Sequence, residues 1–169
     1  MTLEPLLTAS PAIQLHAFTA MAAFGLGIAV LLARKGTAAH RLMGRIWVGL
    51  MVVTALSSFL VHTLRMIGPF SPIHILSVVT LYGSFAGVRA ARRRDFKAHA
   101  RSMQRLFAIA LVGAGIFTLV PGRIMGEVFF SGGLAVGSAI LVVIVAILAW
   151  TAWLAFRRGD RTPMRLTGR

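Results

Sequence analysis

The chain has 169 residues, of which 57% are hydrophobic, with a formal net charge of +14 and no cysteine. This apolar share exceeds what a soluble domain of such length needs, and the length indicates a single domain, 1–169. The absence of cysteine excludes disulfides, thiolate metal sites, cysteine nucleophiles and covalently attached c-type haem. The positive charge does not indicate a nucleic-acid partner, because the charges only flank apolar runs of membrane-spanning length.

Five apolar segments follow one another along the chain. Each is close to the ~20 residues that cross ~30 Å of hydrocarbon. The first ten residues carry no Lys or Arg, so we interpret the first segment as a retained helix and not as a signal peptide. The segments predict an all-α integral membrane protein with five transmembrane helices, at residues 11–33, 38–66, 71–91, 102–120 and 133–156.

The basic residues orient these helices. Of the 18 Lys and Arg, all but Arg65 and Arg123 fall in three clusters, at residues 34–45, 89–105 and 157–169. Cytoplasmic loops of membrane proteins are enriched in such residues. We therefore expect a multi-pass protein of the bacterial inner membrane, with its N-terminus outside, its C-terminus in the cytoplasm, and anionic lipids against the basic face. Trp47 lies near the inner end of its helix, as is typical of an aromatic belt.

An internal repeat with an offset of 58 residues divides the chain. It relates residues 11–68 to residues 69–126, and its matched pairs are His16 and His74, Arg34 and Arg92, and Arg65 and Arg123. Both halves begin and end outside, so they predict a four-helix core from a duplicated hairpin, with a pseudo-two-fold axis along the membrane normal. The fifth helix, 133–156, would cover this core, and residues 157–169 form a basic tail.

Two pairs of small residues lie within the repeat. Gly25 and Ala29 have the spacing that allows close helix contact, and so do Gly83 and Gly87. They lie on the helix faces opposite His16 and His74. We therefore expect the glycine faces to pack helices together and the histidine faces to look elsewhere.

The five histidines form two layers. His16, His62 and His74 lie toward the outer side, and His40 and His99 lie at the inner surface. Ionisable groups are costly inside a membrane and usually face a bundle interior or a cavity. The histidines are therefore the first candidates for a functional site.

One hypothesis is a haem b cytochrome that transfers electrons. Bis-imidazole ligation needs two histidines that face each other from different helices, and the repeat places His16 opposite His74 and His40 opposite His99. Haem propionates would need cationic partners. The candidates are Arg65 and Arg123 for the outer layer, and Arg41 and Arg101 for the inner layer.

Three alternatives stay open. His16 and His74, with His62, can bind a transition metal. The outer histidines can instead bind a quinone headgroup, and His62 and Arg65 share a helix face that suits such an oxygen. Finally, the histidines can be purely structural, in a non-enzymatic membrane module, an accessory subunit or a small carrier. His40 and His99 stand beside arginines ahead of the apolar stretch, which favours a solvated or phosphate-contacting role for that pair.

A family resemblance rests on three short segments. The chain resembles the bacterial membrane-protein family called domain of unknown function 2306 over about residues 14–126, through His16, Ala39-His40-Arg41-x-x-Gly44-Arg45-Ile46-Trp47 and His99-x-Arg101-x-Met103. Trp47 stands where the family often has Tyr, and Ala100 replaces an Arg. The resemblance implies a membrane location and no activity. A looser architectural similarity links the two histidine layers to di-haem cytochromes of the b561 kind.

No soluble catalytic chemistry is indicated. The four acidic residues are Glu4, Asp95, Glu127 and Asp160, and none lies inside an apolar segment. A carboxylate pair for acid–base catalysis is therefore missing. If the chain is an enzyme, we expect a membrane oxidoreductase linked to quinol.

Overall fold

The computed structural model describes residues 2–61, 72–120 and 122–131, and in these ranges it contains helices and no strand. The prediction of an all-α fold is confirmed for this part of the chain. The expected fifth helix at 133–156, the tail at 157–169, His62 and Arg65 lie outside the described residues.

The first hairpin consists of α2 (Pro11–Leu32) and α3 (Ala38–Ser58). Pro11 begins α2, where its missing N–H costs nothing. Gly36 adopts a φ of +80° in the connecting turn, and the Thr37 side chain caps α3 by accepting a hydrogen bond from the His40 backbone N–H at 3.1 Å. The predicted helix at residues 11–33 matches α2 at both ends to within one residue.

Helix α3 ends earlier than the predicted end at residue 66. The helix ends at Ser58, because the hydroxyls of Ser57 and Ser58 donate to the carbonyls of Thr54 and Ala55, and the next N–H groups bond three residues back. Such local hydrogen bonds compete with the helical pattern. The predicted continuation from 59 to 61 is therefore wrong, and residues 62–66 lie outside the described part.

The second hairpin consists of α4 (Pro72–Arg92) and a continuous run of α5 (Phe96–Leu106), the π-helix η1 (Phe107–Gly113) and α6 (Ala114–Thr118). Asp95 caps α5 by accepting from the Ala98 N–H, so this run begins six residues before the predicted start at 102. Arg94 closes the preceding turn in the left-handed conformation, with a φ of 61°.

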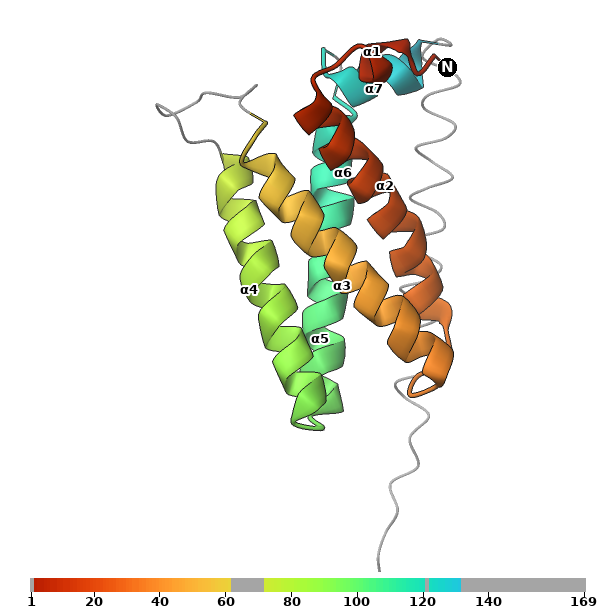
Figure 1. Ribbon diagram of the computed structural model, residues 1–169, viewed down its shortest axis with the longest axis vertical. Helices are drawn as coiled ribbons and strands as arrows, with labels where there is room; N and C mark the ends of the chain where they lie inside the picture. The colour runs from red at the N-terminus through yellow and green to blue at the C-terminus, as the bar shows by residue number, and fades with distance from the viewer. Residues whose placement is uncertain (1, 62–71, 121, 132–169) are drawn as a thin grey trace, which may run out of the picture.

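Two short helices were not predicted. They are α1 (Glu4–Leu7) and α7 (Ile124–Phe130), which pack against each other at the same end of the bundle, where Figure 1 shows them side by side. Leu6 and Val128 are buried in their contact together with Ala17 of α2. Their shortness hides them from any search for spanning segments.

The core between the hairpins is built around Trp47 of α3. It is 3% exposed, stacks among Met51, Leu106 and Phe107, and donates its Nε1–H to the Ala23 carbonyl of α2 at 2.9 Å. The expected position of Trp47 in an interfacial belt is therefore wrong. Its indole N–H finds a partner inside the bundle, so it needs no headgroup water.

The glycine prediction is right in one hairpin and wrong in the other. Gly83 and Gly87 do face α5, where an added Cβ would meet Leu106 and Met103. In α2, however, Gly25 is exposed and has nothing within 4 Å, whereas Gly27 is buried beneath the rings of Trp47 and Phe107. The close contact is fixed by these large rings rather than by the small-residue spacing.

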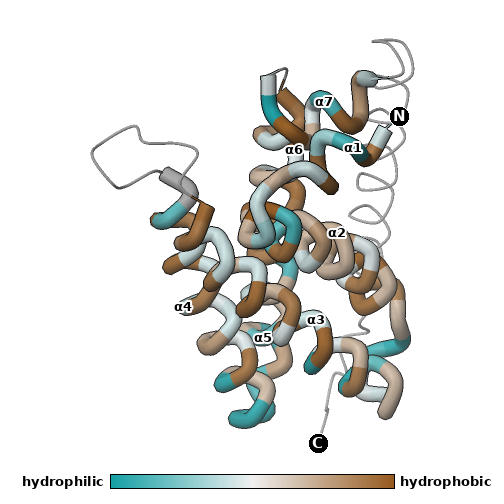
Figure 2. The backbone as a smooth tube through the Cα atoms, turned by 45° about the horizontal axis from the view of Figure 1, so that its top comes forward, coloured by the Kyte–Doolittle hydropathy of each residue, from teal (hydrophilic) through white to brown (hydrophobic). Residues whose placement is uncertain are grey.

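The bundle has two chemically different ends. We call the end that carries both hairpin turns, 33–37 and 93–95, the basic end; eleven of the twelve described Lys and Arg lie in or near these turns. The opposite end carries α1 and α7. Figure 2 shows hydrophilic residues gathered at the basic end and hydrophobic ones along the middle of the helices. The first two basic clusters therefore share one end, as predicted.

Candidate functional site

Helix α4 buries its polar side and exposes its apolar side. The inward face consists of His74, Ser77, Thr80 and Ser84, each at most 8% exposed, spaced as one face of a helix. The outward face is apolar: Ile75, Val78, Tyr82 and Phe85 are between 57% and 73% exposed. This arrangement is the reverse of a helix on the surface of a soluble protein.

A layer of hydroxyl groups continues this polar face across the bundle. Ser77 of α4 hydrogen-bonds Ser58 of α3, and Thr54 of α3 donates to Thr19 of α2 at 3.0 Å. Each pair joins two neighbouring helices. Because buried polar groups need partners, these contacts hold α2, α3 and α4 in register at the level of His16.

His16 is fixed in one orientation. Its Nδ1 lies 3.0 Å from the Thr54 carbonyl oxygen and 3.3 Å from the Ser57 hydroxyl. A carbonyl oxygen only accepts, so Nδ1 carries the hydrogen and donates it. In the neutral imidazole Nε2 is then the acceptor, and Nε2 has no hydrogen-bond partner among the described residues.

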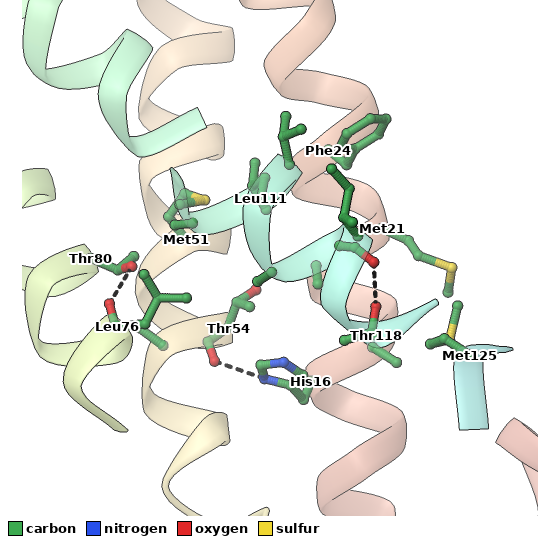
Figure 3. Close-up of a pocket in the computed structure, with 18 of the residues that line it drawn as sticks. His16, Met21, Phe24, Met51, Thr54, Leu76, Thr80, Leu111, Thr118 and Met125 are labelled. Atoms are coloured by element: carbon green, nitrogen blue, oxygen red, sulfur yellow. Dashed lines mark hydrogen bonds between the residues drawn. The ribbon is translucent and has the colours of Figure 1, made fainter. Parts of the chain in front are cut away.

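A cavity of about 270 Å³ lies beside this imidazole. Its wall is almost entirely apolar, and its polar exceptions are His16, Thr54, Ser77, Thr80 and Thr118. Figure 3 shows the imidazole among the residues that line the cavity, which include Leu111, Met21 and Met125. A mostly apolar pocket with a few convergent polar groups is the usual form of a small-molecule site.

The π-helix η1 forms one wall of this cavity, through Ala110, Leu111 and Val112. A π-helix widens the turn; it is rare in proteins and, where it occurs, is frequently found at a functional site. It lies within the segment that we predicted as a regular helix, 102–120. Nothing in the residue pattern of that segment distinguishes it from an α-helix.

His74 has a different environment from its repeat mate. It is 8% exposed, its ring lies 5.4 Å from that of Phe59 between centroids, and it is not among the described residues that line the cavity. His16 lines this cavity, whereas His74 is not part of its described lining. Their pairing as haem ligands stays a prediction.

The inner histidines lie at the basic end. His99 donates Nδ1–H to the Gly87 carbonyl at 2.9 Å, which ties α5 to α4. His40 stands in the first turn of α3, ahead of its apolar part, and its Nδ1 is buried without a partner among the described residues. Burial lowers the pKa of His40, and the positive fields of Lys35 and His99 lower it further. His99 is therefore bonded within the bundle, whereas His40 is half-buried, and their pairing across a cofactor stays a prediction.

The arginines proposed for haem propionates have other contacts. Arg123 lies over the Phe117 ring, 4.1 Å from its centroid, and Arg41 donates to the Gly36 carbonyl at 2.7 Å. Arg101 lines a groove between α4 and α5. Their role toward a propionate stays a prediction.

Metal binding gains no support in the described part of the chain. No three His, Cys, Asp or Glu side chains come together there as a metal site requires. A metal role for His16 and His74, alone or with His62, stays a prediction for the same reason as the haem role: the described residues show no shared centre.

Several residues of the site were missed at the level of sequence. They are the hydroxyl residues Thr54, Ser77 and Thr80 and the apolar wall from η1 and α7. The spacing of His74, Ser77, Thr80 and Ser84 along an otherwise apolar helix was the available signal, since it marks one buried polar face.

Fold and site together define a class. One described helix, α2, is by itself long and apolar enough to cross a membrane, and α4 turns apolar side chains outward around a polar interior. The chain is a helical membrane protein. It belongs to the family described as "Predicted membrane protein (DUF2306)", whose model matches residues 13–158. No curated protein matches the chain, and no solved structure does.

Proposed function

We propose that the chain is a multi-pass membrane protein in which α2, α3, α4 and the α5–η1–α6 run each cross the bilayer. The inverted surface of α4 supports this. In water, its exposed Ile75, Tyr82 and Phe85 would cost free energy at about 25 cal/mol per Å² of apolar area, and in lipid they cost none. Two of the buried hydroxyls of α4 have partners inside the bundle, as spanning helices require: Ser77 hydrogen-bonds Ser58, and Thr80 donates to the Leu76 carbonyl.

The orientation follows from charge. The basic end carries nearly all described Lys and Arg, so we place it in the cytoplasm of a bacterial inner membrane, with α1 and α7 outside. A reporter fused within the turn 93–95 should be cytoplasmic, and one fused after Thr2 should be outside. The reverse result would contradict this placement.

We further propose that the cavity beside His16 binds a membrane-soluble quinol. The observation that carries this is the free Nε2 of His16, an acceptor, in a mostly apolar cavity of about 270 Å³. A quinol ring fits an apolar wall, and its hydroxyl donates a hydrogen bond. Thr54 holds the imidazole so that Nε2 stays the acceptor.

This geometry distinguishes the two redox forms of the ligand. A quinol hydroxyl donates to Nε2, whereas a quinone carbonyl only accepts and would meet a second acceptor. An unpaired buried acceptor costs about 1–3 kcal/mol. We therefore expect the quinol to bind about tenfold or more tightly than the quinone, since 1.4 kcal/mol corresponds to tenfold.

The test is equilibrium binding to the full chain in lipid nanodiscs, with a short-chain ubiquinol analogue kept reduced under argon and with its oxidised form. His16→Ala should weaken quinol binding at least tenfold and remove the preference for the reduced form. His74→Ala is the matched control, because it removes the repeat mate, which is not among the cavity-lining residues. This variant should retain both the quinol affinity and the preference for the reduced form. Equal binding of quinol to wild type and His16→Ala would overturn the proposal.

Haem b is a second candidate, favoured by one observation. Histidines that bind metal usually donate their other N–H to a carbonyl, as His16 does to Thr54. In this cavity a thioether of Met21, Met51 or Met125, which line it, would hold the iron together with His16. Haem bound there would supply one-electron chemistry.

An absorption spectrum separates the two candidates. Protein purified from haem-replete cells should show a reduced b-type band if haem binds, and His16→Ala should abolish it. If no band appears and the quinol preference is present, the quinol proposal holds and the haem candidate is excluded.

A further inference from the structure

A second concave site lies between α4 and α5, and Ala110 lines both this site and the cavity of His16. It is a groove of about 330 Å³. From α4 it is lined by Tyr82, Gly83 and Ala86, and from α5 by one helix face that includes Arg101 and Arg105. The small residues of α4 leave the space, and Ser102 closes its floor by donating to the Gly83 carbonyl at 2.9 Å.

The two arginines face the same groove, because they are four residues apart on α5. Both side chains are exposed, and neither has a hydrogen-bond or ion-pair partner among the described residues. The nearest described carboxylate by sequence, Asp95, accepts from the Ala98 N–H as a helix cap. The pair therefore presents unneutralised positive charge.

Arg105 lies deep for a charged residue. It is nine residues beyond Phe96, which corresponds to about 13 Å of helix at 1.5 Å per residue. At this level α4 already exposes Tyr82 and, toward the opposite end, Val78 and Val79. A cation at the boundary of an apolar belt is expensive unless an anion accompanies it or it extends to the interface.

We propose that this groove is a binding site for one anionic phospholipid, such as phosphatidylglycerol. Arg101 and Arg105 bind the phosphate, and one acyl chain follows the apolar end of the groove between Tyr82 and Ile109. Charge complementarity identifies the headgroup, and the continuation of the groove from guanidinium groups to an apolar wall identifies a lipid. The proposal rests on the membrane placement of α4 and α5 given above.

Lipid binding in this groove differs from the general attraction of anionic lipids to a basic surface. Arg92 and Arg93 are also exposed at the basic end, but they do not line the groove. A diffuse attraction would depend on all of these residues alike. A groove site depends on the Arg101 and Arg105 pair and on the space beside Ala86.

The test is native mass spectrometry of the full chain with phosphatidylglycerol, phosphatidylcholine and inorganic phosphate added separately. Wild type should retain one phosphatidylglycerol at least tenfold more tightly than phosphatidylcholine. The double variant R101Q/R105Q should lose this preference, and the control R92Q/R93Q should keep it within about twofold. Equal loss in both double variants would overturn the proposal in favour of diffuse charge.

A third variant tests the lipid chain independently of charge. Ala86→Leu narrows the groove and leaves both arginines in place, so it should weaken phosphatidylglycerol binding. If inorganic phosphate competes fully with phosphatidylglycerol and Ala86→Leu has no effect, the site binds free phosphate and the lipid assignment is wrong. Failure of the membrane placement is distinguishable, because carbonate would then extract the chain from membranes.

Discussion

The two hairpins carry matching sequences yet surround their histidines differently. In the first, His16 reaches from α2 to the Thr54 carbonyl of α3 and faces the cavity. In the second, His74 at the matching position is buried against the Phe59 ring, and the wall opposite α4 contains the π-helix η1. Residues that the repeat matches in the sequence therefore do not have equivalent surroundings in the structure.

The helix contacts of the hairpins differ as well. In the first, Gly27 lies under the ring of Trp47 and under that of Phe107 from the second hairpin. In the second, Ser102 and His99 bond the carbonyls of Gly83 and Gly87. Ring packing leaves no tolerance for an added atom. Hydrogen bonds beside flexible side chains leave more tolerance for an added atom, because those side chains can move. This difference ranks the expected effects of substitutions.

The largest effect is expected for Gly27→Ala. Its Cβ would lie 2.7 Å from both the Phe107 ring and the Trp47 Nε1, so the rings must shift. Overpacking of this kind costs about 1–3 kcal/mol, which lowers Tm by about 2–4 °C per kcal/mol in a chain of this size. Thermal unfolding in mild detergent measures it.

Gly25→Ala is the matched control on the same helix. It has nothing within 4 Å and should leave Tm unchanged or raise it slightly, since Ala is the better helix former. An equal loss of Tm in the two variants would contradict ring packing as the cause.

Trp47→Phe comes next. It keeps the aromatic ring in the core but removes the donor to the Ala23 carbonyl. We expect a loss of about 0.5–1.5 kcal/mol, the net value of a hydrogen bond. If Trp47→Phe melts at the temperature of wild type, this bond does not hold α2 against α3.

A smaller effect is expected for Gly87→Ala in the second hairpin. The added Cβ would meet the terminal methyl of Met103, which can move. It would also lie 3.2 Å from the Ser102 hydroxyl, which is closer than ordinary van der Waals contact. Tm should fall by less than in Gly27→Ala. The opposite order would show that the second hairpin is the more rigid one.

The smallest effect is the pH dependence from His40. Because burial lowers its pKa in the folded state, the unfolded chain binds more protons below the ordinary value of 6.5. Stability should therefore be constant above pH 6.5 and fall as the pH decreases through it. His40→Gln should reduce this slope in a series of Tm measurements from pH 7.5 to 5.5, and an unchanged slope would exclude His40 as its source.

Much of the architecture could be predicted from hydropathy and charge. Segment 11–33 and segment 71–91 match α2 and α4 closely, because long apolar runs and flanking charges mark spanning helices directly. The early end of α3 could not be seen this way, since it depends on which carbonyls Ser57 and Ser58 bond. The π-helix leaves no mark in composition.

The candidate site was predictable only in part. The cost of placing an imidazole in a membrane made His16 a candidate, and the structure places His16 at the wall of a cavity. Its equivalence with His74 followed from the repeat alone, but packing of Phe59 depends on a helix end that the repeat does not determine. The same limit applies to Gly25 and Gly27, where a distant pair of rings, not local spacing, selects the buried glycine.

The most direct measurement is ¹⁵N nuclear magnetic resonance of histidine-labelled protein in nanodiscs, titrated with the reduced quinol analogue. We expect the Nε2 resonance of His16 to shift on ligand addition, because this nitrogen gains a hydrogen-bond donor, and the resonances of His74, His40 and His99 to stay unchanged. Assignment comes from the His16→Ala variant. A His16 resonance that is unaffected by saturating quinol, or a shift confined to the other histidines, would contradict the account.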